Sequence, residues 1–173
     1  SLDPSALAAT PSGTAAGSSN AITYVIKLRT SNSVNQKALY QIGDLGAATS
    51  SFSIGYSAVD TLEIRHNSSG ATNATQSIDV SSCYSKWTVL IAQAYVHHSG
   101  APALGKAFLY DLQSGAVIAE AAKAVGDVGL ISNSAAVSAI GYGEQSGGLN
   151  AAYTTTDFLI GVDIAEVTAI ARA

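Results

Sequence analysis

The sequence has few of the residues on which redox, metal-binding and nucleic-acid-binding proteins depend. It has one cysteine, Cys83, so it forms no internal disulfide and carries no paired-cysteine motif. Its eight lysines and arginines are scattered over 173 residues, and the net charge is −4. Binding to nucleic-acid phosphates requires grouped basic residues. We therefore expect no nucleic-acid partner, and we expect Cys83 to be a small buried apolar side chain.

Long apolar segments are also missing. No run approaches the roughly 18 apolar residues that cross a bilayer, so we expect no membrane insertion. The first twenty residues lack the charged start and apolar centre of a signal peptide. Hydrophobic residues make up 47% of the chain and charged residues only 12%, which suits one folded domain. Abundant Ala, Gly, Ser and Thr with little Lys and Glu is typical of extracellular or virion proteins, and we expect that localisation.

Short stretches of alternating apolar and polar residues are what the sequence does contain. In residues 22–29 the apolar side chains share one face, a period of two that predicts a half-buried strand. Residues 86–98, "KWTVLIAQAYVHH", form the most apolar run and predict a central strand buried on both faces. The segments "KAFLYDL" and "GAVIAEA" are separated by "QSG". This pattern predicts a hairpin with Gly115 at positive φ.

About ten such strands, with turn signals roughly every 8–12 residues and no clear amphipathic helix, predict an all-β fold. We expect an antiparallel β-sandwich, a jelly roll, over residues 21–173. Residues 1–20 read as an extended arm, in which Leu2 and Leu7 are the only large apolar side chains. Ordering a backbone costs about 1–2 kcal/mol per residue, so the arm needs a partner surface. We expect that surface on other subunits of an assembly, either copies of this chain or virion proteins.

Several motifs follow one another in a recognisable order. Trp87 opens the strand "KWTVLIAQAYV"; "AFLYDLQSG" and "SAIGYG" follow, and the closing strand carries residues 164–167, "IAEV". In this order, over roughly residues 22–173, the chain resembles the laminin-G and pentraxin-like branch of the concanavalin A-like lectin/glucanase superfamily. The resemblance implies a concanavalin A-like jelly roll. Gly161 lies one residue further from the closing motif than the family favours, a difference that a β-bulge can absorb.

The closing strand also holds two carboxylates, Asp163 and Glu166. Retaining glycanases of the resembled fold carry E-x-D-x-x-E on one strand, and their two catalytic carboxyl groups lie about 5–5.5 Å apart. The first position of that motif corresponds here to Gly161, so the nucleophile is missing. The three-residue separation also predicts that Asp163 and Glu166 lie on opposite faces of a regular strand. We therefore expect no catalytic residue and no enzymatic activity.

Candidate binding residues gather around the long loop before the closing strand. Aromatic rings pack against the C–H faces of sugars, and amides hydrogen-bond to sugar hydroxyls. On this basis we predict four carbohydrate-binding residues: Tyr142, Glu144, Asn150 and Tyr153. Trp87 is a further potential sugar platform, but its place at the head of the most apolar strand predicts a core anchor instead.

The residues predict no cofactor and no metal site. His97 and His98 are sequence neighbours, so they point in opposite directions from a regular strand and do not bind one ion together. The family resemblance leaves calcium at the sandwich rim open. Calcium requires about six to eight oxygen ligands. The loop carboxylates that could contribute are dispersed in the sequence: Asp44, Asp127, Glu144 and Asp157.

Together these patterns favour a non-enzymatic, lectin-like sandwich. We expect it to be a structural or adhesive protein on an extracellular assembly, such as a capsid decoration or tail component of a bacteriophage virion. A free carbohydrate-binding lectin with a cell-surface glycan as its partner is an alternative. A glycoside hydrolase or lyase of the same fold is a third.

Overall fold

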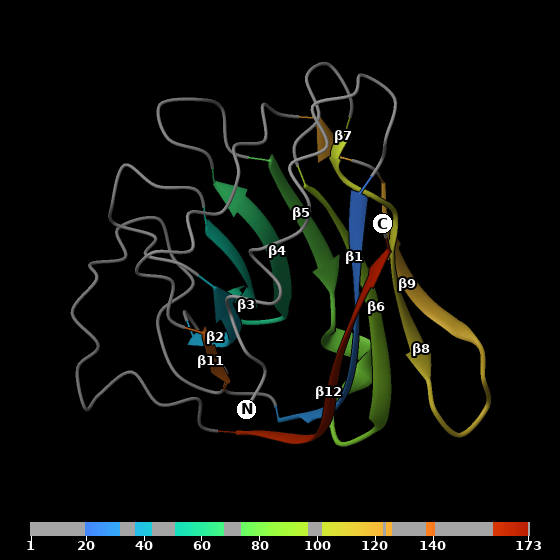
Figure 1. Ribbon diagram of the computed structural model, residues 1–173. Coiled ribbons are helices and arrows are strands. Elements are labelled where there is room, and N and C mark those ends of the chain that lie inside the picture. The colour runs from blue at the N-terminus through green and yellow to red at the C-terminus, as the bar shows by residue number, and fades with distance from the viewer. Residues whose placement is uncertain are drawn as a thin grey trace.

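The prediction of an all-β fold is confirmed. The computed structural model describes residues 20–31, 37–42, 51–67, 74–96, 102–122, 124–125, 138–140 and 161–172. Most of these residues lie in strands, which form two antiparallel sheets (Figure 1). One 3-10 turn, η1 (Ser81–Cys83), precedes the strand that begins at Trp87. In the described part of the chain, no helix is long and apolar enough to cross a membrane.

Sheet A is built around one long strand, β1 (Asn20–Thr30). On one side β1 pairs with β12 (Val162–Arg172), which is the last strand of the path on that side. On its other side β1 pairs along ten residues with β6 (Trp87–Val96). The neighbours of β1 are therefore segments that lie far away in the sequence.

Beyond β6 the sheet continues with two pairs of short strands, and each pair occupies one strand position in the sheet. β7 (Pro102–Leu104) and β8 (Ala107–Asp111) both pair with β6. β10 (Ala124–Val125) pairs with β7, and β9 (Val117–Ala121) pairs with β8. Gly105 lies at the break between β7 and β8. Sheet A is thus five strand positions wide.

Position 105 needs a glycine because the Gln93 side chain packs directly against it. Its amide donates to the Gln93 carbonyl at 3.0 Å, and a Cβ on residue 105 would lie 2.6 Å from Gln93 Oε1. The buried Gln76 reaches across from sheet B, and its amide nitrogen donates to the carbonyls of Gly105 and Ala122. One side chain of sheet B therefore joins the β7–β8 connection of sheet A to the neighbouring β9–β10 connection.

Sheet B is an antiparallel sheet of five strands. Their spatial order is β11 (Ser138–Ile140), β2 (Lys37–Ile42), β3 (Ser51–Ala58), β4 (Thr61–Asn67) and β5 (Ala74–Asp79). Two tight turns carry residues with positive φ, Asp60 between β3 and β4 and Gly115 between β8 and β9. The hairpin with Gly115 at positive φ was predicted from the sequence, and it is confirmed.

The hydrophobic core lies between the two sheets. The predicted inward face of β1 is confirmed, because Ile22, Tyr24, Ile26 and Leu28 are all buried. The Tyr24 ring stacks on Phe52 of sheet B with centroids 4.6 Å apart. At the end of β1, the hydroxyls of Thr30 and Tyr56 form a second link between the sheets. These contacts describe two sheets packed face to face, as a β-sandwich requires.

The strands that are buried on both faces lie in sheet B, so the prediction that assigned this property to residues 86–98 is wrong. Residues 52–56 of β3 are all buried. In β6 the inward residues Thr88 and Leu90 are buried, whereas Val89 and Ile91 are only half-buried. The apolar character of β6 therefore reflects an apolar outer surface. The predicted arm, residues 1–20, lies outside the described residues except for Asn20, which begins β1.

Candidate functional site

The outer face of sheet A, which points away from the core, carries a band of apolar side chains. The register sets Val89 beside Tyr110 and Ile91 beside Phe108, and Tyr110 is in turn beside Val117. Leu112 follows at the hairpin, where its amide donates to the Trp87 carbonyl at 3.0 Å. We call this band the aromatic strip, with these members: Trp87, Val89, Ile91, Phe108, Tyr110, Leu112 and Val117.

The strip is in contact with water. Leu112 keeps 44% of its surface exposed and Val117 keeps 50%, while the other five members are half-buried. Half-burial is what neighbouring side chains on an open sheet face give one another. The strip is therefore a contiguous apolar surface, of the kind that marks binding sites on soluble proteins.

Charged residues border the strip along β1 and β12, and here the structure corrects an expectation. Lys27 lies opposite Glu166, but the next residue of β1, Leu28, lies opposite Ile164, so Ala165 is an extra residue. This β-bulge shifts the alternation of β12 by one position. As a result Asp163 and Glu166 both lie on the outer face, and the prediction of opposite faces is wrong.

Both carboxylates on this border have partners. Arg29 donates from Nε and Nη2 to Asp163 Oδ2 at 2.9 and 2.7 Å. Glu166 lies opposite Lys27 in the register and accepts a hydrogen bond from the Thr168 hydroxyl at 2.9 Å. The Arg29 and Asp163 side chains stay 45% and 59% exposed, so their ion pair is hydrated.

Trp87 connects the charged border to the strip. Arg29 Cζ lies 5.1 Å and Lys27 Nζ lies 5.5 Å from the centroid of its ring, both within cation–π range. The prediction that Trp87 anchors the core is wrong, because Trp87 is half-buried on the outer face. The inward residue at this end of β6 is Thr88, whose hydroxyl donates to the Leu28 carbonyl at 3.2 Å.

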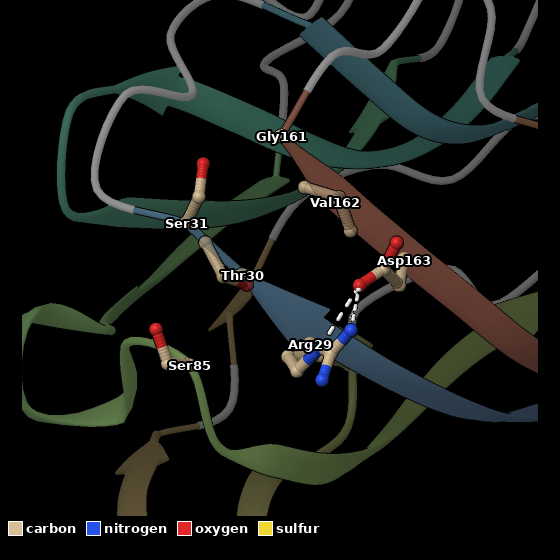
Figure 2. A pocket seen from close by; sticks show the side chains of 7 residues that line it. All are labelled: Arg29, Thr30, Ser31, Ser85, Gly161, Val162 and Asp163. Carbon is tan, nitrogen blue, oxygen red and sulfur yellow. Dashed lines mark hydrogen bonds and ion pairs between the residues drawn. The ribbon is translucent and has the colours of Figure 1, made fainter.

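A hollow of about 310 Å³ lies at the end of β1, next to the Arg29–Asp163 pair (Figure 2). Its walls are Arg29, Thr30, Ser31, Ser85, Gly161, Val162 and Asp163. Ser31 N–H donates to Gly161 C=O at 2.7 Å, and Ser85 N–H donates to Thr30 C=O at 2.9 Å. Gly161 and Ser85 adopt positive φ values of 85° and 61°. The hollow thus offers hydroxyl, carboxylate and guanidinium groups to a polar ligand.

Sheet B carries a different charged pair on its outer face, and its burial is not evident from the sequence. Arg65 Nη2 lies 2.8 Å from Glu63 Oε1, and the side chains are only 16% and 9% exposed. Ser53, opposite Arg65 in the register, is fully buried. The alternation correctly predicts that Glu63 and Arg65 point away from the core. The small residues Ser53 and Gly55 lie opposite Arg65 and Glu63 in the register.

The four predicted carbohydrate-binding residues, Tyr142, Glu144, Asn150 and Tyr153, lie outside the described residues. The same holds for both histidines considered as ligands and for the loop carboxylates considered for calcium: His97, His98, Asp44, Asp127 and Asp157. Among the residues that the structure describes, no group of three or more His, Cys, Asp or Glu side chains could hold a metal ion. Cys83 is buried as predicted, and desolvation by burial raises the pKa of its thiol.

Comparisons of the chain with protein-family models and with curated protein sequences give no match. Membership of the concanavalin A-like superfamily therefore stays a prediction. The features that bear on function are the aromatic strip, its charged border and the hollow at the end of β1.

Proposed function

We propose that the protein is a non-enzymatic β-sandwich of the concanavalin A-like, jelly-roll type. Its proposed role is structural or adhesive, on an extracellular assembly such as a bacteriophage virion. The observation that carries this proposal is the aromatic strip. A contiguous apolar surface bordered by charged residues has the anatomy of a protein–protein interface, with an apolar centre and a polar rim.

The surroundings of the two carboxylates on β12 support a non-enzymatic role. A retaining glycanase needs one carboxylate free to attack and one carboxylic acid to protonate the leaving group. Asp163 is instead held by the guanidinium of Arg29 through two hydrogen bonds to one oxygen. Asp163 and Glu166 are also both exposed on an open sheet face, where bulk water competes with any ordered substrate.

Incorporation into native particles tests the proposal. We expect the protein at a fixed stoichiometry in purified extracellular particles from its source. The double variant Leu112→Lys/Val117→Lys should be lost from them, because it places charge in the strip. Val59→Lys is the matched control, since Val59 is 47% exposed on the β3–β4 turn of sheet B. Absence of the protein from such particles, or release of reducing ends from glycans by the pure protein, would contradict the proposal.

Carbohydrate binding is a second candidate function, and the hollow at the end of β1 favours it. Ser31, Ser85 and Asp163 supply hydrogen-bonding groups to the hollow, and Arg29, which also lines it, lies over the Trp87 ring. On a glycan array, an Asp163→Ala variant should lose any binding made at the hollow. A Glu120→Ala variant, which removes an exposed carboxylate at the far edge of the same sheet, should bind like the unchanged protein. Binding that both variants retain would exclude the hollow as the site.

A further inference from the structure

We propose that the aromatic strip docks onto a second copy of this chain, so that two sandwiches pack through the outer faces of their A sheets. This inference rests on the proposed role in an assembly and names the first partner in it. A two-fold axis in the interface plane would bury the same surface of both copies, the commonest arrangement in soluble oligomers.

The distribution of apolar groups is the first argument. Three aromatic and four aliphatic side chains occupy adjacent positions on β6, β8 and β9 and in the turn between β8 and β9, with no charged residue among them. Aromatic enrichment and charge depletion at the centre are what distinguish an interface core from ordinary protein surface. Among the described large hydrophobic residues, Leu112 and Val117 are also among the most exposed.

The charges around the strip are the second argument, because they favour an identical partner. Lys27, Arg29 and Lys106 contribute three positive charges on this face. Among the side chains that the structure describes, the negative charges on this face are equally many, from Glu120, Asp163 and Glu166. These described charges balance, although the whole chain carries a net charge of −4. Two copies of a face with balanced charges approach each other without net repulsion. A strongly charged partner would meet no net charge of opposite sign on this face.

The size of the face is the third argument. The outer face includes β12, β1, β6, β8 and β9, and its rows run along β1 from Thr23 to Arg29. With strands about 4.8 Å apart and about 3.4 Å per residue, it covers about 550 Å². Two copies therefore bury about 1,100 Å², which exceeds the roughly 1,000 Å² expected of a specific interface. Sheets that pack face to face through apolar side chains are a standard arrangement.

The test uses the full chain and its only tryptophan, which lies in the strip. Sedimentation velocity over a concentration series should show a monomer–dimer equilibrium. Over the same series the fluorescence of Trp87 should shift to shorter wavelength and become less accessible to iodide, because docking removes the ring from water. A chain that stays monomeric up to millimolar concentration would overturn the inference.

Substitutions then locate the contact. Leu112→Lys/Val117→Lys should raise the dimer dissociation constant at least about 100-fold, since docking would bury ammonium groups that have no partner. Val59→Lys should leave it unchanged, and both variants should keep the unchanged protein's circular dichroism. A dimer that persists in the double variant, or that forms without a change at Trp87, would show that another surface associates, such as the edge of β12 or residues 1–19. That result overturns the inference.

The outcomes also separate this inference from the proposed function. If the chain is monomeric alone but the double variant is still lost from native particles, the strip binds a different protein. The proposed function then stands and self-association is wrong. If the chain dimerises through the strip but is absent from any particle, self-association stands and the assembly role is wrong.

Discussion

The two sheets hold their charged side chains in opposite environments. On sheet A the Arg29–Asp163 pair is 45% and 59% exposed, and the Lys106–Glu120 pair is 51% and 58% exposed. On sheet B the Arg65–Glu63 pair is only 16% and 9% exposed. Exposed pairs contribute little to stability, whereas a buried charge that loses its partner is costly.

This difference indicates a division of labour between the sheets. Sheet A has an inner face in the core and an outer face in water, so substitutions on its outer face should change binding more than folding. Sheet B has buried residues on both faces, so its polar side chains should matter for stability. Four predictions test this contrast.

The largest loss of stability should come from the contact between the sheets. Tyr24→Ala removes a fully buried ring that stacks on Phe52, and we expect it to lower the free energy of unfolding by about 3–5 kcal/mol. Tyr110→Ala is the matched control, because Tyr110 is half-buried on the outer face of sheet A, and it should cost about 1 kcal/mol. Chemical denaturation measures both. Equal losses would remove the distinction between the inner and outer faces.

The two ion pairs should respond very differently to loss of their carboxylates. Glu63→Gln leaves the largely buried Arg65 without its counter-charge, and we expect a loss of about 3 kcal/mol. Asp163→Asn removes one member of a hydrated pair and should cost no more than about 1 kcal/mol. Denaturation of both variants at neutral pH gives the comparison. Similar losses would show that burial does not separate the sheets energetically.

Acid should destabilise the protein through a buried histidine of sheet B. Burial lowers the pKa of His66 to about 4 from its usual 6.5, so the unfolded chain takes up the proton first. The stability of the fold with neutral His66 is therefore complete above pH 6.5 and is lost as the pH falls towards 4. Between pH 7 and pH 5 we expect a loss of about 2 kcal/mol. His66→Gln should abolish this part of the pH dependence. An unchanged pH profile in that variant would show that other groups cause the loss.

Trp87→Ala should have a smaller effect than the loss of a core aromatic residue. Because Trp87 is half-buried on the outer face, we expect a loss of about 1–2 kcal/mol, below the cost of removing a fully buried aromatic side chain. Thermal denaturation at low protein concentration measures the folding contribution without association. A loss as large as that of Tyr24→Ala would mean that Trp87 supports the core after all.

The sequence predicts features that depend on local spacing. The inward residues of β1 follow from a period of two, and the β8–β9 hairpin follows from a glycine between two apolar runs. The burial of Cys83 also agrees with its ordinary apolar role. In each case the pattern of a short segment is sufficient, because its own residues favour the conformation that it adopts in the fold.

Features that depend on distant partners could not be predicted in this way. The bulge at Ala165 arises from the register between β12 and β1. The position of Gly161 relative to the closing motif allows for a bulge in this segment, but the sequence does not say which residue forms it. The bulge overturns the expected placement of Asp163 and Glu166. The position of Trp87 beside Arg29 likewise depends on β1, a strand far away in the sequence.

The pairing of β1 with β12 has a mechanical consequence. Ala21, near the start of β1, lies opposite Arg172, near the end of β12. A pulling force applied at these two positions loads the antiparallel ladder from one end, so its hydrogen bonds break in succession and do not share the load. A tether attached there would unzip the sandwich at low force. An adhesive protein of this design would withstand tension only if another contact, such as one on the outer face of sheet A, carried the load.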